Sequence, residues 1–391
     1  MRTLTLSKSG FNKIRSQQNE LKAADIQDSL KPLPPGEWCH LVAEEHRWLA
    51  FVNPLVGEKN TAVHVLAGAP VAPETFIRSR LEAAVKRRRQ FRGYESGARL
   101  FFGSSDGLPG LIIDQFRNAI LVQINTAGVD RYRDLVAATL NELLKIDVYF
   151  LDNPKYREKE FLPQYEGKLV PGLSVEENEL VYELRSEVIQ KVGFYYDHRE
   201  NRLALRAIVS RLTKTYETGL DLFCYAGAWG MNALKAGVRH VDFVDQGDFQ
   251  AEVETGLQGN SFTNRGSFRR QDVFKFLDEA IAAGRNYDLI MCDPPAFAKS
   301  LQQKDQALDG YSKLHRKVLR LVSPGGLVVF SSCTHYVSHD EFQKNVTDAA
   351  RKEGRSLQLL HCGVQGWDHP ISSQNEKSNY IKSYFYISEP L

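Results

Sequence analysis

The hydrophobic and polar positions follow a regular pattern in the second half of the chain. From about residue 185, short apolar runs alternate with stretches whose apolar residues recur at helical spacing. Strict alternation of this kind predicts an α/β domain with a doubly wound parallel sheet. We expect strands at 218–223, 240–245, 266–270, 287–292, 326–331, 356–362 and 380–387, and helices near 229–236, 248–258, 273–283, 305–321 and 339–353. The last strand follows its neighbour without a helix, so it is predicted to be antiparallel.

The first half of the chain shows two other patterns. Residues 1–72 hold short β-rich runs separated by turns, which is typical of a small, barrel-like β-domain. Residues 73–184 mix helical and strand patterns, which predicts an α+β middle domain. Its expected elements are a helix from Glu74, strands at 98–102, 110–116, 119–125 and 148–151, a helix over about 130–144 and a polar connector near 153–180. The remaining residues, 185–391, form the predicted α/β domain.

Composition and charge limit the classes of protein that fit this chain. With 391 residues, 42% of them hydrophobic and 25% charged, the chain is long enough for two or three domains. The net charge is only +2, so a surface that binds a polyanion would have to be local. No apolar run approaches the roughly 18 residues that span a membrane, and the N-terminus lacks the apolar core of a signal peptide. We therefore expect a cytoplasmic protein with no membrane partner.

The five cysteines are widely spaced, and none belongs to a Cys-x-x-Cys pair. This spacing disfavours a disulfide framework and a structural zinc site, so a reducing compartment and no metal are expected. Cys224 and Cys362 lie within apolar strands and are interpreted as packing residues. Cys292 directly precedes Asp293, and neighbouring strand residues point to opposite faces. We therefore do not expect Cys292 to act as a nucleophile.

Two apolar strands end in polar side chains that suit covalent chemistry. Asp293 follows the strand at 287–292 and precedes two prolines, and Cys333 follows the strand at 326–331 within Ser-Ser-Cys-Thr. The carboxyl ends of parallel strands meet at one edge of a sheet, where ligands bind. A thiolate that adds to C6 of cytosine makes C5 nucleophilic, and a carboxyl group on N3 assists the addition. Cys333 is therefore predicted as the nucleophile and Asp293 as the N3 partner, the alternative being a buried cysteine that only fills space.

A glycine-containing loop follows the first strand of the α/β domain. Within Asp221-Leu-Phe-Cys-Tyr-Ala-Gly-Ala-Trp-Gly230, Gly227 lets the backbone approach a ligand closely, and the N-terminus of the next helix favours a carboxylate or phosphate. Asp245 ends the second strand, where an acid can accept hydrogen bonds from ribose hydroxyls. Asp272 ends the third strand, in position to meet an adenine ring. In the alternative interpretation, Gly227 and Asp245 only shape turns.

These three strand ends favour one cofactor over the others. The Gly-x-Gly-x-x-Gly fingerprint of nicotinamide and flavin sites is absent. The arrangement suits S-adenosylmethionine, with the amino-acid end on the glycine loop, the ribose on Asp245 and the adenine near Asp272. The predicted cofactor contacts are Phe223, Tyr225, Ala226, Gly227, Asp245, Asp272 and Asp293.

A basic segment begins the middle domain. Between Arg78 and Arg92 the only acid is Glu82. The residues predicted to contact RNA phosphates are Arg78, Lys86, Arg87, Arg88, Arg89 and Arg92. Such contacts supply affinity that is independent of sequence and that weakens as the salt concentration rises. The alternative is a solvated helix face, which is the ordinary role of a charge run.

Seven short segments of this chain are familiar from one enzyme family. They are Ser105–Asp114, Gly193–Arg202, Phe223–Gly227, Asp272–Phe274, Asp293–Phe297, Ser332–Cys333 and Asp368–Pro370. Together they resemble the bacterial large-subunit ribosomal RNA cytosine-5 methyltransferases that join a PUA domain to a Rossmann-like class I methyltransferase domain. The resemblance implies S-adenosylmethionine as the cofactor and 5-methylcytosine in large-subunit ribosomal RNA as the product. It also implies that Cys333 is the nucleophile and that Tyr195, Asp197 and Arg199 border the cofactor pocket, although Arg199 could instead be a structural ion-pair partner.

The chain departs from the family at two places. Arg15–Lys22 stands where the family usually has an aromatic, glycine-containing turn. Ala296 stands where many RNA cytosine-5 methyltransferases carry a second cysteine, as is usual for this subfamily, so the group that removes the C5 proton is not identified. A target cytosine must be unpaired or flipped out of its stack to reach such a site.

Two other functions stay open. One is an RNA methyltransferase that acts on a nitrogen of guanine or adenine and uses Asp-Pro-Pro-Ala-Phe to hold an exocyclic amine. The other is a non-catalytic RNA-binding or assembly protein with the same fold. A homodimer is retained as a candidate oligomeric state.

Overall fold

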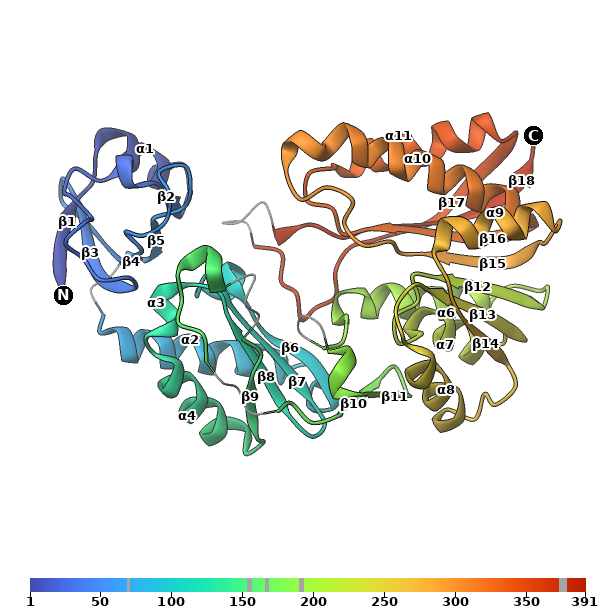
Figure 1. Cartoon of the computed structure of the whole chain (residues 1–391), viewed down its shortest axis with the longest axis horizontal. Helices are drawn as coiled ribbons and strands as arrows, with labels where there is room; N and C mark the ends of the chain where they lie inside the picture. The colour runs from blue at the N-terminus through green and yellow to red at the C-terminus, as the bar shows by residue number, and fades with distance from the viewer. Residues whose placement is uncertain (69–70, 153–156, 166–168, 190–192, 373–377) are drawn as a thin grey trace. The chain divides into compact units, whose positions relative to one another are not determined.

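The computed structural model describes residues 1–68, 71–152, 157–165, 169–189, 193–372 and 378–391. The chain divides into two compact units (Figure 1). The first comprises Met1–Leu173, Ile189–Phe194 and Asp368–Ser378, and the second comprises Ser174–Val188, Tyr195–Trp367 and Asn379–Leu391. The domain boundaries expected after residues 72 and 184 stay a prediction.

The N-terminal part of the first unit is a β-sheet with one short helix. Among the described residues, its strands pair in the order β1-β3-β4-β5-β2. The elements are β1 (Arg2–Thr5), α1 (Lys8–Arg15), β2 (Glu20–Leu21), β3 (Glu37–Ala43), β4 (His46–Val52) and β5 (Val63–Ala67). The β-rich sequence pattern does not predict α1. Its first turn is stabilised by Ser7, whose hydroxyl accepts a hydrogen bond from the N–H of Gly10.

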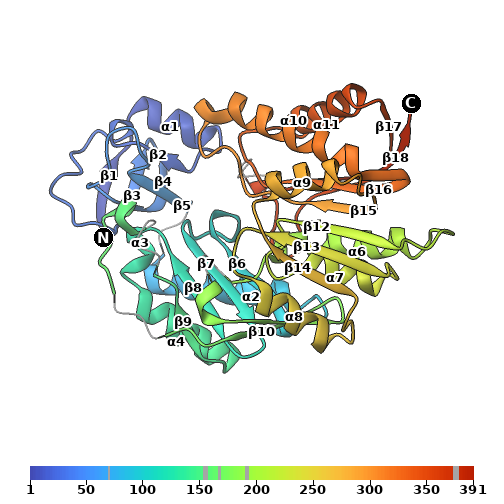
Figure 2. The same ribbon diagram turned by 45° about the vertical axis from the view of Figure 1, so that its right-hand side comes forward.

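The middle part of the first unit is a second sheet, with strand order β6-β7-β8-β9 over the described residues, backed by α2 and α4 (Figure 2). The elements are α2 (Pro73–Arg88), β6 (Gly97–Phe102), β7 (Leu111–Phe116), β8 (Ile120–Ile124), α3 (Ala127–Asp130), α4 (Arg133–Leu144) and β9 (Val148–Phe150). The helix expected over about 130–144 is α4, which begins at Arg133 and follows the short helix α3. Tyr132 separates the two by leaving helical geometry, with φ −114° and ψ 24°.

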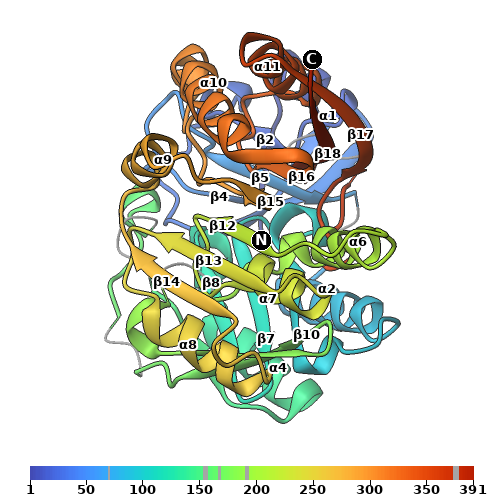
Figure 3. The same ribbon diagram turned by 90° about the vertical axis from the view of Figure 1, so that its right-hand side faces the viewer.

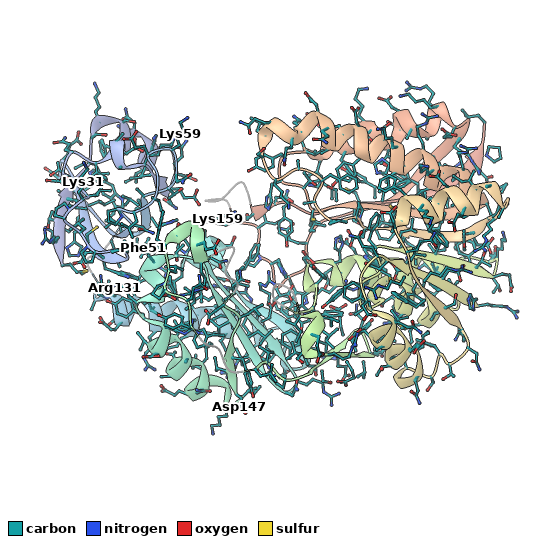
Figure 4. The ribbon with its side chains drawn as sticks, in the orientation of Figure 1. Lys31, Phe51, Lys59, Arg131, Asp147 and Lys159 are labelled. Carbon is teal, nitrogen blue, oxygen red and sulfur yellow. The ribbon has the colours of Figure 1, made fainter. Side chains whose placement is uncertain are left out.

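The two parts of the first unit share one hydrophobic core. Trp38 and Phe51, from β3 and β4, pack in the same cluster as Phe76 from α2. The indole N–H of Trp38 donates to the carbonyl oxygen of Gly128, at 2.9 Å. Phe51 lies where β4 meets α3 (Figure 4), and a Cβ atom on Gly128 would stand 2.1 Å from its ring. Glycine permits this close approach, so the β-sheet and the middle part form a single compact unit.

The second unit contains the predicted α/β sheet. Among the described residues, its strand order is β14-β13-β12-β15-β16-β18-β17. The strands are β12 (Thr218–Leu222), β13 (His240–Asp245), β14 (Gly266–Arg270), β15 (Tyr287–Cys292), β16 (Val322–Ser332), β17 (Arg355–Gly363) and β18 (Lys382–Pro390). The pairs from β14 to β16 are parallel, whereas β18 is antiparallel to both β16 and β17. The prediction of one antiparallel final strand is therefore confirmed.

Two layers of helices cover this sheet, one on each face (Figure 3). One layer contains α9 (Val273–Ala282), α10 (Lys304–Leu321) and α11 (His339–Lys352), and the other contains α6 (Arg199–Val209), α7 (Ala228–Lys235) and α8 (Gln250–Gly259). The predicted class, a doubly wound α/β domain, is confirmed. None of the helices in the described parts of the chain is long and apolar enough to cross a membrane.

A hairpin in the second unit corrects the expected polar connector. Its strands are β10 (Leu173–Glu177) and β11 (Leu180–Leu184). In both strands alternate residues are buried, and β11 packs against α8. Burial of every second residue is the pattern of a half-covered strand, and the charged residues between them conceal it in the sequence.

Candidate active site

Three neighbouring strands bring the predicted reactive residues to one edge of the sheet. In the register of β12, β15 and β16, Leu222 pairs with Cys292, and Cys292 pairs with Phe330. Because all three strands are parallel, the residues after these positions emerge at the same edge. Asp293 follows Cys292 directly, and Cys333 stands at the end of the longer strand β16. The predicted common edge is confirmed.

The turn that carries Cys333 is held from both sides. Cys333 is partly exposed, whereas its neighbours Ser332 and Thr334 are buried. The hydroxyl of Tyr311, from α10, lies 2.8 Å from the hydroxyl of Ser332 and 2.7 Å from that of Thr334. The N–H of Thr334 donates to the Ser332 hydroxyl at 3.2 Å. These bonds fix the backbone on each side of a thiol that solvent can reach.

Asp293 is positioned by two side chains that were not predicted to act together with it. The indole Nε1 of Trp229 donates to Oδ2 of Asp293 at 3.1 Å, so Trp229 does more than pack. The Nε2 atom of His198 lies 3.4 Å from the same oxygen. The motif that begins with Asp293 also contacts the Cys333 turn indirectly, because Phe297 stacks on the ring of Tyr311 with 4.6 Å between ring centroids.

His198 is an ionisable group inside the protein. It is buried, and its Nδ1 lies 3.1 Å from the amide of Asn201. Burial lowers the pKa of His198, but the charge and hydrogen bond of Asp293, together with the charge of Asp197, outweigh burial and the opposing charge of Arg202. The net result is a pKa above the ordinary 6.5, which favours a charged imidazolium facing the Asp293 carboxylate.

The hydroxyl of Tyr195 lies among the other predicted site residues. Its pKa is raised to about 12, first by burial and then by the negative charges of Asp197, Cys333, Asp293 and Asp245. The negative charges of four residues that are spread along the chain therefore raise the pKa of one hydroxyl. The ring of Tyr195 also packs edge-on against Tyr225, with centroids 5.2 Å apart. This convergence brings the predicted nucleophile, the N3 partner and the predicted cofactor residues into one region of the second unit.

The glycine loop has an unusual backbone. Phe223, Tyr225 and Gly227 all have positive φ angles, of 59°, 48° and 77°. Gly227 precedes α7, and its N–H donates to the carbonyl of Cys224 at 2.7 Å. Left-handed geometry at non-glycine residues is uncommon and is often associated with functional sites. The loop therefore turns sharply between β12 and the start of α7.

Two acids lie near the ends of β12 and β13, beside the glycine loop. Asp221 is fully buried; its Oδ2 accepts the N–H of Gly230 at 2.8 Å, and among the described residues its Oδ1 has no hydrogen-bond donor. Burial raises the pKa of Asp221 well above its usual range. The carboxylate of Asp245 accepts the N–H groups of Tyr225 and Gly247, at 3.1 Å and 2.8 Å. The amine and hydroxyl donors of the cofactor complement these oxygens.

Other predicted cofactor residues have structural partners of their own. Asp272 is exposed and caps α9 by accepting the N–H of Lys275 at 3.0 Å. Oδ2 of Asp197 accepts the hydroxyl of Tyr380 at 2.8 Å. Arg199 is buried, 3.5 Å from Glu177, with its guanidinium 4.6 Å from the Trp367 ring centre. These contacts match the structural alternative for Arg199; the roles of Ala226 and the other residues toward the cofactor stay predictions.

The basic segment of the first unit needs one correction. Arg88 is 2% exposed, and its guanidinium pairs with Asp106 at 2.7 Å and donates to the carbonyl of Asp368 at 2.8 Å. It cannot contact a phosphate from this position, so its predicted RNA-binding role is wrong. Arg87 also pairs with Asp106, and Arg78 pairs with Glu142 at 2.7 Å. Lys86, Arg89 and Arg92 are exposed.

The interpretation of the other cysteines holds with one exception. Cys224 and Cys292 are buried as expected, but Cys362 is exposed, so its interpretation as a packing residue is wrong. β17 is the edge strand of the sheet, and consecutive residues such as Leu359 and Leu360 are exposed, so an apolar pattern there did not mean burial. No group of three or more potential metal ligands occurs in the described parts of the chain.

Three residues of the site escaped sequence reasoning. His198 lies inside the segment Gly193–Arg202, where its neighbours drew attention instead. Tyr311 lies in the middle of α10 and resembles an ordinary core aromatic. Lys382 was visible as the one charged residue near the start of an otherwise apolar strand, and this signal could have identified it.

Known proteins are similar to this chain over most of its length. A family described as "Conserved hypothetical protein 95" matches residues 206–357. "Ribosomal RNA large subunit methyltransferase I" of Shewanella amazonensis is 33% identical over 299 residues, 73% of each chain. The protein of the same name from Aeromonas salmonicida is 35% identical over 298 residues, again 73% of each chain.

Solved structures show the same fold. A Streptococcus mutans protein described as a SAM-dependent methyltransferase superposes with a TM-score of 0.77 at 20% identity, covering 99% of this chain and all of the other. A methyltransferase structure in complex with S-adenosylhomocysteine gives a TM-score of 0.79 at 20% identity, with the same coverage. At this identity the likeness shows the fold alone.

Proposed function

This chain belongs to the ribosomal RNA large subunit methyltransferase I family, and from that membership we propose that it methylates carbon 5 of a cytosine in large-subunit ribosomal RNA. It is an S-adenosylmethionine-dependent methyltransferase. The proposal concerns the atom that is methylated, the RNA that carries it and the residues that perform the reaction.

The observation that carries the proposal is that Asp293 and Cys333 follow neighbouring parallel strands and stand at one edge of the sheet. The negative charges of both residues, with those of Asp197 and Asp245, also raise the pKa of the Tyr195 hydroxyl. A second tyrosine, Tyr311, bonds to both neighbours of Cys333, and the charges of Cys333 and Asp293 both raise its pKa. A thiol and a carboxyl group in one site is the pair that carbon-5 chemistry on cytosine requires, whereas methyl transfer to a nitrogen needs no thiol.

The proposed reaction begins when the thiolate of Cys333 forms a bond to C6 of cytosine. The electrons of the C5–C6 double bond then make C5 nucleophilic, while N3 takes up a proton through the carboxyl of Asp293, which faces the His198 imidazolium as the proton source. S-adenosylmethionine, when bound, supplies the activated methyl group that C5 accepts. Water takes the C5 proton, the bond from Sγ to C6 breaks to restore the aromatic ring and the thiolate, and the proton on N3 returns through Asp293 to His198.

The cofactor would be held at the ends of β12, β13 and β14. The loop with Phe223, Tyr225 and Gly227 lies at the start of α7, where an anionic carboxylate is favoured. Asp245 suits the ribose hydroxyls. The pre-existing hydrogen bonds of Asp245 orient its carboxylate but use only one lone pair of each oxygen.

RNA contacts are proposed for the exposed residues Lys86, Arg89 and Arg92 of the first unit. Within the described structure none of these three forms an ion pair with a carboxylate, unlike Arg78 and Arg87. Basic side chains of this kind supply affinity that is independent of RNA sequence. A cytoplasmic location and a homodimer, both expected from the sequence, stay predictions that fractionation and sedimentation would measure.

RNA that contains 5-fluorocytidine tests the proposed reaction. Fluorine at C5 blocks proton loss, so wild-type protein with S-adenosylmethionine should form a stable protein–RNA adduct through Cys333. The variant Cys333→Ala should form none, and the control Cys362→Ala, which removes another accessible thiol, should form it as wild type does. Methylated RNA made without an adduct, or made by Cys333→Ala, would support the nitrogen methyltransferase and refute this proposal.

A further inference from the structure

A buried ammonium group lies beside the turn that carries Cys333. Lys382 begins β18 and pairs across the sheet with Ser332 of β16. The lysine is 2% exposed. Its Nζ donates to the carbonyl oxygens of Thr334 and Tyr380, at 2.9 Å each. Because Thr334 directly follows Cys333, these bonds hold the positive charge next to the thiol.

Lys382 has an unusual environment for a cation. A buried ammonium group normally pairs with a carboxylate, yet the bonds of Lys382 in the described structure go to uncharged carbonyl oxygens. Burial lowers the pKa of Lys382 to about 8, and the negative charge of Cys333 opposes this effect. The interaction between two charges is mutual, so the ammonium also favours the thiolate form of Cys333.

We propose that Lys382 holds Cys333 as a thiolate before the substrate arrives. Carbonyl oxygens occupy two of the three N–H donors of Lys382, and the third has no partner within the described structure. The thiol proton passes to solvent, and the sulfur lone pair that remains forms the bond to C6. The identity of the base that Cys333 attacks rests on the proposed function. The ionisation of the Cys333 thiol does not. Lys382 acts through Cys333 and is therefore a positioning residue.

Three other side chains packed around this pair are uncharged at neutral pH. Tyr311 from α10 and Tyr195 before α6 both face Cys333, and the pKa of each is raised to about 12, mainly by burial. His339 from α11 faces Lys382, and its pKa is lowered first by burial and then by the charge of Lys382. The charged His198 pairs with Asp293. Lys382 is thus a cation beside Cys333, whose negative charge raises the pKa of the lysine.

The rate at which iodoacetamide alkylates Cys333, measured from pH 5 to pH 10 with the full-length protein, tests the proposal. Alkylation requires the thiolate, so the midpoint of the pH profile reports its formation. Working with Cys362→Ser removes the other exposed thiol, and peptide mass spectrometry isolates Cys333. We expect a wild-type midpoint below the value of about 8.5 for an unperturbed cysteine.

Three variants separate charge from structure. Lys382→Met, of similar length, should move the midpoint upward by about one pH unit and slow alkylation at pH 7 roughly tenfold, whereas Lys382→Arg should keep the low midpoint. Ser383→Ala removes the neighbouring buried hydroxyl, which bonds to Ser331 at 2.8 Å, without changing charge, and should leave the midpoint unchanged.

Two results would overturn the inference. A wild-type midpoint at or above about 8.5 does so without any variant. A folded Lys382→Met protein with the wild-type profile does so as well. The alkylation profile contains no RNA, so a failed 5-fluorocytidine adduct with an intact Lys382 effect would refute the proposed function alone.

Discussion

The Nε2 atom of His198 lies 3.4 Å from Oδ2 of Asp293, on a histidine that is buried and would otherwise prefer to be neutral. Trp229 donates to the same carboxylate oxygen. The arrangement joins the turn before α6 to the end of β15 through an ion pair that depends on pH. A histidine whose folded pKa exceeds 6.5 stabilises the fold below that pH, and this contribution is lost as the pH rises through the folded pKa.

Replacing Asp293 with Asn should reverse the direction of the His198 shift. The change removes the charge and hydrogen bond that raise the pKa, and burial, which lowers it, remains. We expect His198 to titrate above pH 6.5 in the wild type and below pH 6.5 in Asp293→Asn. NMR titration of the histidine ring signals, assigned with His198→Gln, measures both values. If the two proteins titrate alike, Asp293 is not the partner that charges His198.

Gly227→Ala should lower the free energy of unfolding more than Gly284→Ala, although the two glycines have similar backbone geometry. Both have positive φ, 77° and 65°, so each alanine carries about 1–2 kcal/mol of backbone strain. A Cβ at 227 would also stand 3.0 Å from the ring of Phe243, which adds about 1–3 kcal/mol of overpacking, whereas at 284 nothing lies within 4 Å. Urea unfolding of the two variants compares the costs. Equal losses of unfolding free energy would mean that the Phe243 ring moves aside without a measurable loss of stability.

Arg88→Ala should destabilise the first unit strongly. Removal of Arg88 leaves the carboxylate of Asp106 buried with Arg87 and the N–H of Phe102 as partners, and breaking a buried ion pair typically costs about 3–5 kcal/mol. Arg78→Ala, which breaks a more exposed pair with Glu142, should cost less than about 1 kcal/mol. Thermal or urea unfolding measures the loss of stability in both variants. A small loss for Arg88→Ala would show that Arg87 and the Phe102 N–H together satisfy Asp106.

The triple variant Lys86→Ala, Arg89→Ala, Arg92→Ala should bind RNA with a weaker dependence on salt. Each lost phosphate contact on a single strand lowers the slope of log affinity against log salt by about 0.7, so the slope should fall by about 2. Fluorescence anisotropy between about 50 and 200 mM salt measures this slope. Lys344→Ala, an exposed lysine on α11 outside the basic segment, is the control for charge alone. If the triple variant shows the wild-type dependence of RNA affinity on salt, these three residues face solvent and do not contact RNA.

The α/β domain could be predicted because its signals are local. Strands such as β15 are continuous apolar runs bounded by turn residues, and the capping box of Ser338 and Glu341 marks the start of α11. The helix α1 and the hairpin β10-β11 escaped because charged residues interrupt their apolar positions. Their buried faces become visible only when the surfaces that cover them are known.

The sequence predicts those residues of the site that follow the ends of strands. Asp293 and Cys333 stand at such ends, so their common edge followed from the parallel sheet. His198 and Tyr311 reach the site from elsewhere in the chain, and tertiary packing alone brings them there. Arg88 shows the opposite error, since its place in a run of basic residues concealed a buried partner, Asp106, eighteen positions later.

The position of β18 has a consequence for the order of assembly. This strand is synthesised after β17 yet inserts between β17 and β16. During synthesis, β17 is therefore made before β18, its partner strand, and β16 has an unpaired edge. Unpaired edges can pair wrongly with strands of other molecules. The insertion that closes this gap also delivers Lys382 to Cys333. If Lys382 holds Cys333 as a thiolate, a nascent chain has a reactive Cys333 only after β18 has inserted. A partly folded chain would then be less readily alkylated at this sulfur.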